Sequence, residues 1–493
     1  MIWFLLSSGL FLGWSLGAND AANIFGTSVS TRMVKFRVAA ALASVFIILG
    51  ATISGAGTTH TLEVLGDVNA IAGSFTVSLA AALTVFALIK RGLPVSVSQA
   101  IVGSIIGWNL FTASPTDFAS LTSIVISWIV NPVLACVFSF LIYNILKKVV
   151  SKMKLHILEL DLYTRIALIL VTIFGSYALG ANNIAKVVGV FITTSPFRDI
   201  NITSNFTFTS VQQLFLVGSL SMAVGVMTYS QKTISTIGSQ IFKLTPISAF
   251  SSVFSASLVL FFFSSQSLER LLNSLGLPSF PLVPVSITQS MVGAVMGIGF
   301  AKGGRYINYK IIGKIAIGWL ATPVCAGIIC LISLFIVQNV FQQIVVNPSS
   351  YEVTIPVLTE LEKTGISTAT LSKYENRIFT SQSEFRQHLK SIDINKEEEL
   401  YKIFQVAKIE NYHFDSNYVN QKLSPEIFSP QQIEALKKLH NESFKHQWQI
   451  MDKLKLISDT WREAPDVKEN EVYNKELRRE YQIIFSTFKV VDK

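Results

Sequence analysis

The string GANDAAN at residues 17–23 recurs as GANNIAK at residues 180–186. After each of these strings a second one follows: PVSVSQAIVG at 94–103 in the first case and PVSITQSMVG at 284–293 in the second. The two pairs stand in the same order, so a residue of the first copy has a counterpart in the second. These strings predict that the first part of the chain contains two copies of one structural unit.

A third motif belongs to the same series. The pattern WxxxP at 128–132 recurs at 319–323, and Gly107 corresponds to Gly297. One motif alone would indicate little, because membrane helices commonly use Gly, Asn and Pro for packing and kinks. Three motifs in one order predict an internal repeat.

The composition is that of an integral membrane protein. Half of the residues are hydrophobic, 14% are charged and the mean hydropathy is +0.49, whereas soluble domains carry about 25% charged residues. Residues 1–344 hold 19 basic and 8 acidic residues, and residues 345–493 hold 21 and 23. The positive excess therefore belongs to the membrane part, which argues against nucleic acid as a partner. The three cysteines lie in apolar runs, which excludes a disulfide scaffold.

Ten apolar stretches are candidates to cross a bilayer, and the fourth and ninth are short enough to be hairpins or half-helices. The first is expected to be a retained helix, since it has no basic segment before it. The stretches are 1–17, 38–54, 70–89, 99–113, 120–146, 162–180, 210–228, 246–263, 287–301 and 311–341.

The charges of the connecting loops predict the orientation. Basic and non-basic loops alternate along the chain, which places both termini outside the membrane. Each copy has five crossings, an odd number, so the second copy enters with the opposite orientation. The expected fold is an all-α polytopic membrane protein with two inverted-topology repeats, broken helices or hairpins, and a helical soluble domain. Its expected parts are a first repeat at 1–150, a cytoplasmic linker at 151–161, a second repeat at 162–344 and the soluble domain at 345–493.

The soluble part carries Lys, Glu and Gln at helical spacing. Ser429-Pro430 followed by Gln432 predicts a helix start, because a capping residue, a proline and a capping-box partner stand in order. The histidines here lack ligand spacing and are expected at the surface: His413, His440 and His446. This part either stabilises or dimerises the protein, or binds a regulatory partner.

Asp20 is the one acidic residue of the membrane part that lies within an apolar stretch, away from the predicted loops. An ionisable residue in hydrocarbon is usually functional. Asn19 and Asn23 flank it, and Gly17 is expected to loosen the helix there. Carboxylate and amide oxygens suit a hard cation. The alternative is that Asp20 caps a helix that begins at Ala21, and the two interpretations are compatible.

PVSVSQ and PVSITQ each place proline, two hydroxyl residues and glutamine at the start of an apolar helix. Proline interrupts the preceding helix, and the free N–H groups of the next one form an anion site. Without an arginine, such a site would bind moderately and release its ligand. The alternative is that the hydroxyls only cap these helices. The candidate anion-binding residues are Ser96, Ser98, Gln99, Ser286, Thr288 and Gln289.

The duplicated strings resemble those of the inorganic phosphate transporter (PiT) family of cation-coupled symporters, over about residues 1–340. The resemblance implies a transporter and not an enzyme, with both termini outside and phosphate held between paired helix breaks. No cofactor is implied beyond Na⁺ or H⁺ as coupling ion. Carried over motif by motif, it implies that Asp20 and Asn23 would hold Na⁺ if sodium is used. It also implies that the full set of coupling-ion ligands or their supports is Asn19, Asp20, Asn23, Asn182 and Asn183.

The second copy departs from the family pattern at two positions. Asn183 stands where aspartate is usual, and Lys186 where asparagine is usual. The Lys186 ammonium either replaces a bound cation or pairs with the anion, and either would change the coupling ratio. A third interpretation is that it snorkels to the surface or pairs with Asp20.

The leading hypothesis is import of inorganic phosphate by symport with Na⁺ or H⁺ through alternating access. Phosphate leads because it carries a proton that it can donate to a buried carboxylate, whereas sulfate does not. A sulfate or related oxyanion permease is one alternative, and a transporter-derived scaffold or receptor is another. The expected location is a cell membrane, the inner membrane of a bacterium. The expected partners are phosphate, the cation and lipid, with a homodimer as one option.

Overall fold

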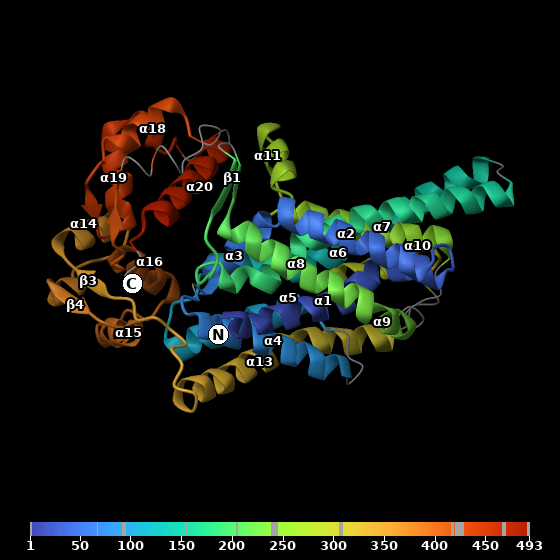
Figure 1. Ribbon diagram of the computed structural model, residues 1–493, viewed down its shortest axis with the longest axis horizontal. Coiled ribbons are helices and arrows are strands. Elements are labelled where there is room, and N and C mark those ends of the chain that lie inside the picture. The colour runs from blue at the N-terminus through green and yellow to red at the C-terminus, as the bar shows by residue number, and fades with distance from the viewer. Residues whose placement is uncertain are drawn as a thin grey trace. The chain divides into compact units, whose positions relative to one another are not determined.

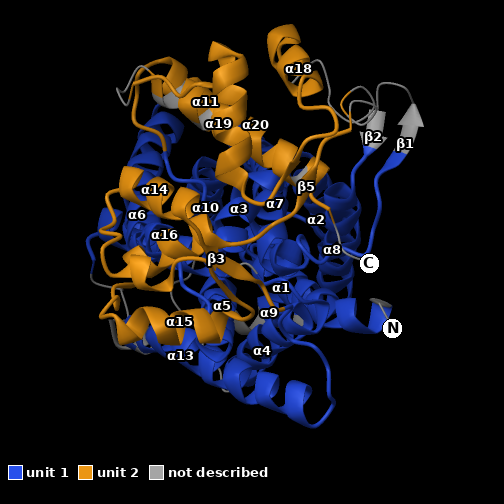
Figure 2. Ribbon diagram, turned by 90° about the vertical axis from the view of Figure 1, so that its left-hand side faces the viewer, with its two compact units in different colours: residues 1–268, 280–347 blue, residues 269–279, 348–493 orange. Residues whose placement is uncertain are grey.

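The computed structural model describes residues 2–66, 68–90, 95–153, 156–203, 206–237, 245–304, 309–415, 419, 428–465 and 470–490. The chain divides into two compact units (Figure 2). Unit 1 comprises Met1–Leu268 and Phe280–Asn347, and unit 2 comprises Glu269–Ser279 and Pro348–Lys493. The short segment Glu269–Ser279, which interrupts unit 1 in the sequence, therefore belongs to unit 2, and the sequence pattern did not indicate this.

Unit 1 is a bundle of helices (Figure 1). A short 3-10 helix η1 (Gly189–Phe191) and a β-hairpin of β1 (Ile200–Thr203) and β2 (Phe206–Phe208) lie between α7 and α8. The helices are α1 (Ile2–Ser30), α2 (Phe36–Ser54), α3 (Ala56–Gly66), α4 (Ile71–Lys90), α5 (Val97–Thr112), α6 (Phe118–Met153), α7 (Ile157–Val188), α8 (Ser210–Thr228), α9 (Ser230–Ile237), α10 (Pro246–Ser264), α12 (Ile287–Ala301) and α13 (Tyr309–Asn339).

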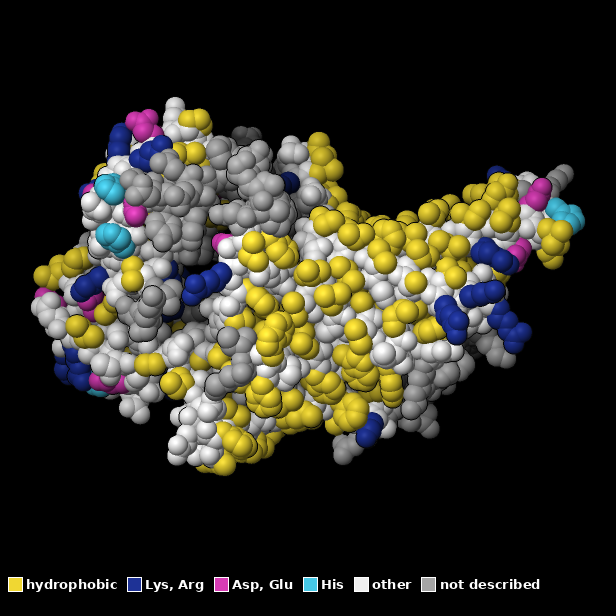
Figure 3. Space-filling view, viewed as in Figure 1, with side chains coloured by type: hydrophobic (Ala, Val, Ile, Leu, Met, Phe, Trp, Pro, Cys, Tyr) yellow, Lys and Arg dark blue, Asp and Glu magenta, His cyan; other side chains and the backbone are white. Residues whose placement is uncertain are grey.

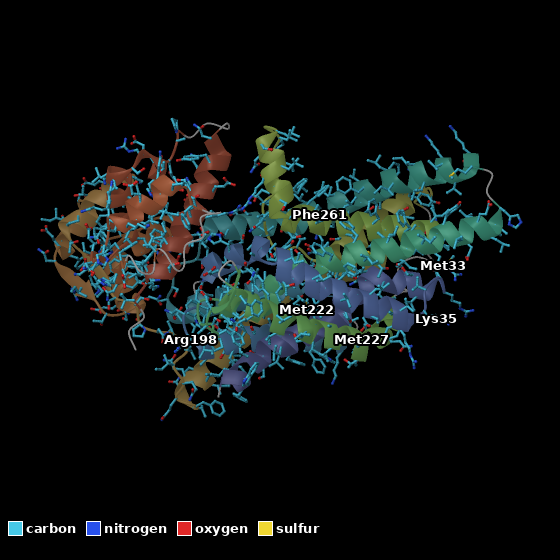
Figure 4. All side chains as sticks on the ribbon, turned by 45° about the horizontal axis from the view of Figure 1, so that its top comes forward. Met33, Lys35, Arg198, Met222, Met227 and Phe261 are labelled. Carbon is cyan, nitrogen blue, oxygen red and sulfur yellow. The ribbon has the colours of Figure 1, made fainter. Side chains whose placement is uncertain are left out.

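The surface of unit 1 is that of a membrane-embedded bundle. Among the described residues, six helices are long and apolar enough to cross a bilayer, and α5 and α12 are shorter apolar helices. Large apolar side chains such as Ile129 and Leu320 are exposed, and Figure 3 shows hydrophobic side chains covering the helical body. Lys35 and Arg198 lie at opposite ends of the unit (Figure 4). The six spans are α2, α4, α6, Ser210–Gln231, α10 and Ile315–Asn339.

The helices α1 and α7 run antiparallel. Gly13 of α1 lies against Val187 near the end of α7, whereas Ile24, further along α1, lies against Gly175, earlier in α7. These two helices carry the GANDAAN and GANNIAK strings. Corresponding strings therefore meet on helices of opposite direction.

The expected helix break at these strings is not present. Both α1 and α7 continue through them without interruption, so Asp20 does not cap a helix at Ala21. Gly17 instead allows a close helix crossing, because a Cβ there would lie 1.9 Å from the carbonyl oxygen of Met222, a residue of α8 (Figure 4). Its counterpart Gly180 would meet the Ile47 carbonyl oxygen of α2 at 2.1 Å. Glycine serves packing here and does not loosen the helix.

The two copies also exchange contacts reciprocally. A Cβ on Gly103 of α5 would lie 2.1 Å from the carbonyl oxygen of Pro323 in α13, and one on Gly293 of α12 would lie 2.0 Å from that of Pro132 in α6. Gly103 corresponds to Gly293 and Pro132 to Pro323 in the repeated strings. Each short helix thus packs on the long final helix of the other copy, as a two-fold relation between the copies would require.

Unit 2 contains helices and two small antiparallel strand pairs, β3–β4 and β5–β6, which were not predicted. The predicted helix start at Ser429 is confirmed, with Pro430 in the first turn and Gln432 completing the capping box. The elements are α11 (Gln266–Ser274), whose first residues lie in unit 1, β3 (Tyr351–Val353), α14 (Ile355–Lys363), η2 (Leu371–Tyr374), β4 (Arg377–Phe379), α15 (Gln382–Ser391), α16 (Glu397–Ala407), β5 (Tyr412–His413), α18 (Pro430–Lys437), β6 (Ser443–Phe444), α19 (Gln447–Ile457), η3 (Asp459–Trp461) and α20 (Glu471–Phe488).

The expectation that His413, His440 and His446 lie at the surface is wrong for His446. Its side chain is buried, and its Nε2 lies 2.9 Å from Glu352 Oε1. Its Nδ1 lies 2.8 Å from the Lys408 carbonyl oxygen. His446 therefore joins strand β3 to the start of α19 instead of facing solvent.

A largely buried carboxylate, that of Glu410, also stabilises unit 2. Lys489 and Lys408 place their Nζ atoms 2.7 and 3.1 Å from its Oε1. Tyr412 and Gln447 donate to its Oε2 at 2.6 and 2.8 Å. Burial by itself would raise the pKa of Glu410, but the two ammonium groups and these hydrogen bonds outweigh it and hold the pKa well below its ordinary value.

We expect Glu410→Gln to destabilise unit 2 by about 2 kcal/mol at neutral pH, since hydrogen bonds to a charged group are lost. A carboxyl with a lowered pKa stabilises the folded state above its unfolded pKa, and this contribution disappears as pH falls through the folded value. The difference between variant and wild type should therefore shrink below about pH 4.5, the ordinary pKa of glutamate. Hydrogen exchange of peptides around residues 408–414 measures it, and a difference independent of pH would contradict this origin.

We further expect Gly103→Ala and Gly293→Ala to destabilise unit 1 by about 1–3 kcal/mol each, because the added methyl group would overlap a backbone carbonyl. Gly313→Ala is the matched control, since a Cβ there meets nothing within 4 Å. Thermal unfolding of the detergent-solubilised protein checks the three variants. Equal melting temperatures would show that α5 and α12 do not pack as closely as described.

Candidate functional site

The polar centre of unit 1 joins α1 to α7 through Asp20. Asn183 Nδ2 donates to Asp20 Oδ2 at 3.0 Å, and Asn19 Nδ2 donates to Asp20 Oδ1 at 3.1 Å. All three side chains are buried. The carboxylate of the first copy is thus held by an amide of the second.

The same centre reaches the start of α12 through the backbone of one residue, Val285. The side chain of Asn182 forms two hydrogen bonds with the backbone of Val285. Its Nδ2 donates to the Val285 carbonyl oxygen at 2.8 Å, and its Oδ1 accepts from the Val285 N–H at 3.0 Å. Lys186 Nζ donates to the same carbonyl oxygen at 2.6 Å and to Asn183 Oδ1 at 2.6 Å. Val285 directly precedes Ser286, so the GANNIAK string and the PVSITQ string form one connected site.

The interpretation of Lys186 as a snorkelling residue is wrong, because its side chain is only 1% exposed. Direct pairing with Asp20 is not seen either: within the described ranges, no ion pair within 4.0 Å joins them, and Asn183 lies between the two groups, donating to one and accepting from the other.

The helices α5 and α12 begin in the same way. Ser96 and Ser286 are their N-caps, and each Oγ accepts from the backbone N–H of the glutamine three residues later at 3.4 Å. The backbone angles of the two serines agree closely, φ −101° and ψ 114° against φ −98° and ψ 119°. The breaks therefore occur at these strings, and the two serines cap helices as the alternative interpretation held. The first proline, Pro94, lies outside the described residues.

Other polar side chains in the first turns of α5 and α12 have buried atoms without a hydrogen-bond partner in the described part of the chain. Within the described part of the chain, Ser98 Oγ, Gln99 Oε1 and both amide atoms of Gln289 are buried without a hydrogen bond. An unsatisfied buried polar atom costs about 1–3 kcal/mol. Such atoms usually face an ion, a ligand or water. Thr288 is also buried in the first turn of α12.

One residue of the site was not anticipated. Asn131 of α6 donates from Nδ2 to the Ser286 carbonyl oxygen at 2.9 Å, and its Oδ1 accepts from Ser290 Oγ at 2.5 Å. It orients the start of α12 from the first copy of the fold. Its signal was present in the sequence, because Asn131 stands inside the repeated WxxxP pattern directly before Pro132.

Two groups of expected site residues remain apart from this network. Asn23 Nδ2 donates to the Asn19 carbonyl oxygen of its own helix at 3.4 Å. Within the described residues no hydrogen bond connects Asn23 or the PVSVSQ string to Asp20. The structure thus brings together Asn19, Asp20, Asn182, Asn183, Lys186 and the start of α12.

Buried amides around Asp20 and Lys186, within a bundle of apolar helices, are typical of a membrane transport protein. The sequence pattern of the phosphate transporter family matches residues 16–330 and 279–410 of the chain. The chain belongs to the phosphate transporter family, as its repeated strings predicted.

Its relatives carry names that agree with this family. A protein of Pyrococcus abyssi named as a candidate phosphate permease is 26% identical over 404 residues, which is 66% of this chain and 96% of that protein. A protein of Haemophilus influenzae with the same description is 24% identical over 425 residues, 69% of this chain and 97% of that one. A chloroplastic inorganic phosphate transporter of Arabidopsis thaliana is 24% identical over 416 residues, 64% of this chain and 68% of that one.

A solved structure supports the fold. The structure of a sodium-dependent phosphate transporter matches with a TM-score of 0.53 at 22% identity, and covers 68% of this chain and 98% of that one. The mostly helical, multi-pass membrane fold is thereby confirmed, and the three short strand pairs among the described residues are an addition that the sequence did not predict. This likeness concerns the fold, and the roles of individual residues rest on the geometry above.

We expect Gln289→Leu to leave the stability of the protein unchanged or raise it, because it removes a buried amide without partners and fills the same volume. The same change should weaken equilibrium binding of labelled phosphate at least tenfold, if the amide faces the anion. Gln432→Leu is the matched control, since that buried amide donates to Glu480 at 2.6 Å and its loss should lower the melting temperature. Normal phosphate binding by Gln289→Leu would remove this residue from the anion site.

Proposed function

We propose that this protein imports inorganic phosphate by symport with Na⁺ or H⁺, through alternating access of the two repeats. The main support for the proposal is the pair of hydrogen bonds between Asn182 and the backbone of Val285, directly before the α12 N-terminus. It ties the start of a helix suited to an anion to a centre that contains Asp20. When the anion and cation sites are in contact, binding at one can change the affinity of the other, as coupled transport requires.

The anion is proposed to bind at the starts of α5 and α12. A helix N-terminus attracts anions through its free N–H groups and its dipole. The hydroxyl of Ser98, that of Thr288 and the amide of Gln289 add donors of the kind that a tetrahedral oxyanion accepts. Unsatisfied buried atoms at both starts support this role. The arrangement holds phosphate without arginine, so release stays possible.

The coupling cation is proposed to bind beside Asp20, with Asn19 and Asn183 as further oxygen ligands or as their supports. A carboxylate oxygen with neighbouring amide oxygens suits Na⁺, and the carboxylate alone could carry a proton. The sodium-dependent transporter that shares the fold supports Na⁺. Asn23 donates from Nδ2 to its own helix, so its Oδ1 is the atom that would contribute.

Alternating access is proposed to use the inverted relation of the two copies. The antiparallel course of α1 and α7 and the reciprocal packing of α5 on α13 and α12 on α6 support that relation. Folds of this kind expose a central site to either side by moving one repeat against the other. The loop charges predict an orientation in which both termini lie outside the membrane.

Uptake by the purified protein in proteoliposomes tests the proposal. We expect labelled phosphate to accumulate under an inward Na⁺ or proton gradient, and an excess of sulfate to leave uptake unchanged. Sulfate uptake in place of phosphate would indicate the alternative oxyanion permease. Absence of uptake under every gradient would favour a scaffold or receptor.

The variant Asp20→Asn should abolish gradient-driven uptake while the protein stays folded, since the amide cannot carry the charge that the cation neutralises. Asp117→Asn, at the start of α6 and outside the site, is the control and should transport normally. Full gradient-driven uptake by Asp20→Asn would exclude Asp20 from coupling.

A further inference from the structure

The two copies of the fold differ in charge at corresponding positions. Asp20 of the first corresponds to Asn183 of the second, and Asn23 corresponds to Lys186. The second copy therefore has an amide where the first has an acid, and an ammonium where the first has an amide. Both strings lie within continuous helices, α1 and α7, so the difference concerns the chemistry of their side chains.

The surroundings of Lys186 Nζ are those of a bound cation. Its two acceptors are a backbone carbonyl oxygen, that of Val285, and a side-chain amide oxygen, that of Asn183, each at 2.6 Å. Neutral oxygens of these kinds are the usual ligands of a hard cation in a protein. The side chain is buried, and within the described ranges no carboxylate lies within 4.0 Å of it. Nothing in its immediate contacts therefore resembles an ordinary ion pair.

Charge balance explains how the ammonium is tolerated. A charge inside the membrane is costly unless another charge compensates it. Asn183 relays the interaction, because its oxygen accepts from Lys186 and its nitrogen donates to Asp20. The anion at the start of α12 would add further compensation, since Lys186 binds the carbonyl oxygen next to Ser286.

We propose that the Lys186 ammonium is a built-in cation of the second copy: it takes the place of a transported Na⁺ between Asn183 and Val285. This inference rests on the proposed function and specifies its coupling. A tethered cation supports anion binding but cannot leave with the substrate. The protein then carries one Na⁺ fewer for each phosphate than a protein in which both copies bind a mobile ion.

A purely structural role for Lys186 makes a different prediction. The Val285 peptide already has two hydrogen bonds to Asn182, so the start of α12 stays anchored when Lys186 is replaced. A structural lysine would therefore leave cation dependence unchanged in any folded variant. A built-in cation would alter cation dependence and leave the fold intact.

The test compares Lys186→Asn, which restores the residue of the first copy, with Lys186→Met, which removes the charge and supplies no oxygen. Equilibrium binding of labelled phosphate is measured against Na⁺ concentration, and the ratio of Na⁺ to phosphate flux is measured in proteoliposomes. We expect the Hill slope for Na⁺ and the flux ratio to rise by about one in Lys186→Asn. We expect Lys186→Met to bind phosphate at least tenfold more weakly at every Na⁺ concentration.

Lys147→Asn, at the exposed end of α6, is the matched control and should behave as wild type. An unchanged Hill slope in a folded Lys186→Asn protein overturns the inference, even if transport is lost, because binding is measured without turnover. Phosphate binding of wild-type strength by Lys186→Met overturns it as well. If the wild type neither binds nor transports phosphate, the proposed function itself fails, and that outcome is distinct from both.

Discussion

One amide, Asn183, connects the two copies of the fold at their charged centre. It donates to Asp20 on α1 and accepts from Lys186 on its own helix, so a carboxylate and an ammonium are linked without touching. An amide can do this because it carries a donor and an acceptor at once. A carboxylate at this position would instead place two acids side by side, and one of them would have to be neutralised.

The repeated strings were sufficient to predict the helical membrane fold and the helix starts at Ser96 and Ser286. They were misleading at Gly17, where the sequence suggested a loosened helix and the structure has a continuous one. The reason is that glycine has two uses in a membrane helix, flexibility and close approach. Only the neighbouring helix decides between them. The carbonyl oxygen of Met222 lies where a Cβ would be, so close approach is the use here.

The network around α12 could not be predicted from sequence alone. Asn182 and Val285 belong to different strings, and their contact depends on how α7 passes the interrupted segment. The repeated WxxxP pattern marks the position of Asn131, but its hydrogen bond to the Ser286 carbonyl oxygen depends on how α6 packs on α12. His446 shows the same limit in unit 2, because polar composition indicated exposure while Glu352 provides a buried partner. Tertiary contacts decide such cases, and residue type does not.

The two repeated strings on α1 and α7 carry different charges at corresponding positions. Packing constrains the glycines and prolines at the crossings, because the helices on both sides depend on them. The polar residues between them are constrained by their hydrogen bonds and by the net charge that the bilayer tolerates. The second copy can therefore hold Lys186 without an acid of its own, as long as Asp20 in the first copy balances the charge. In this chain Asn183 links the two charges, because it accepts a hydrogen bond from Lys186 and donates one to Asp20.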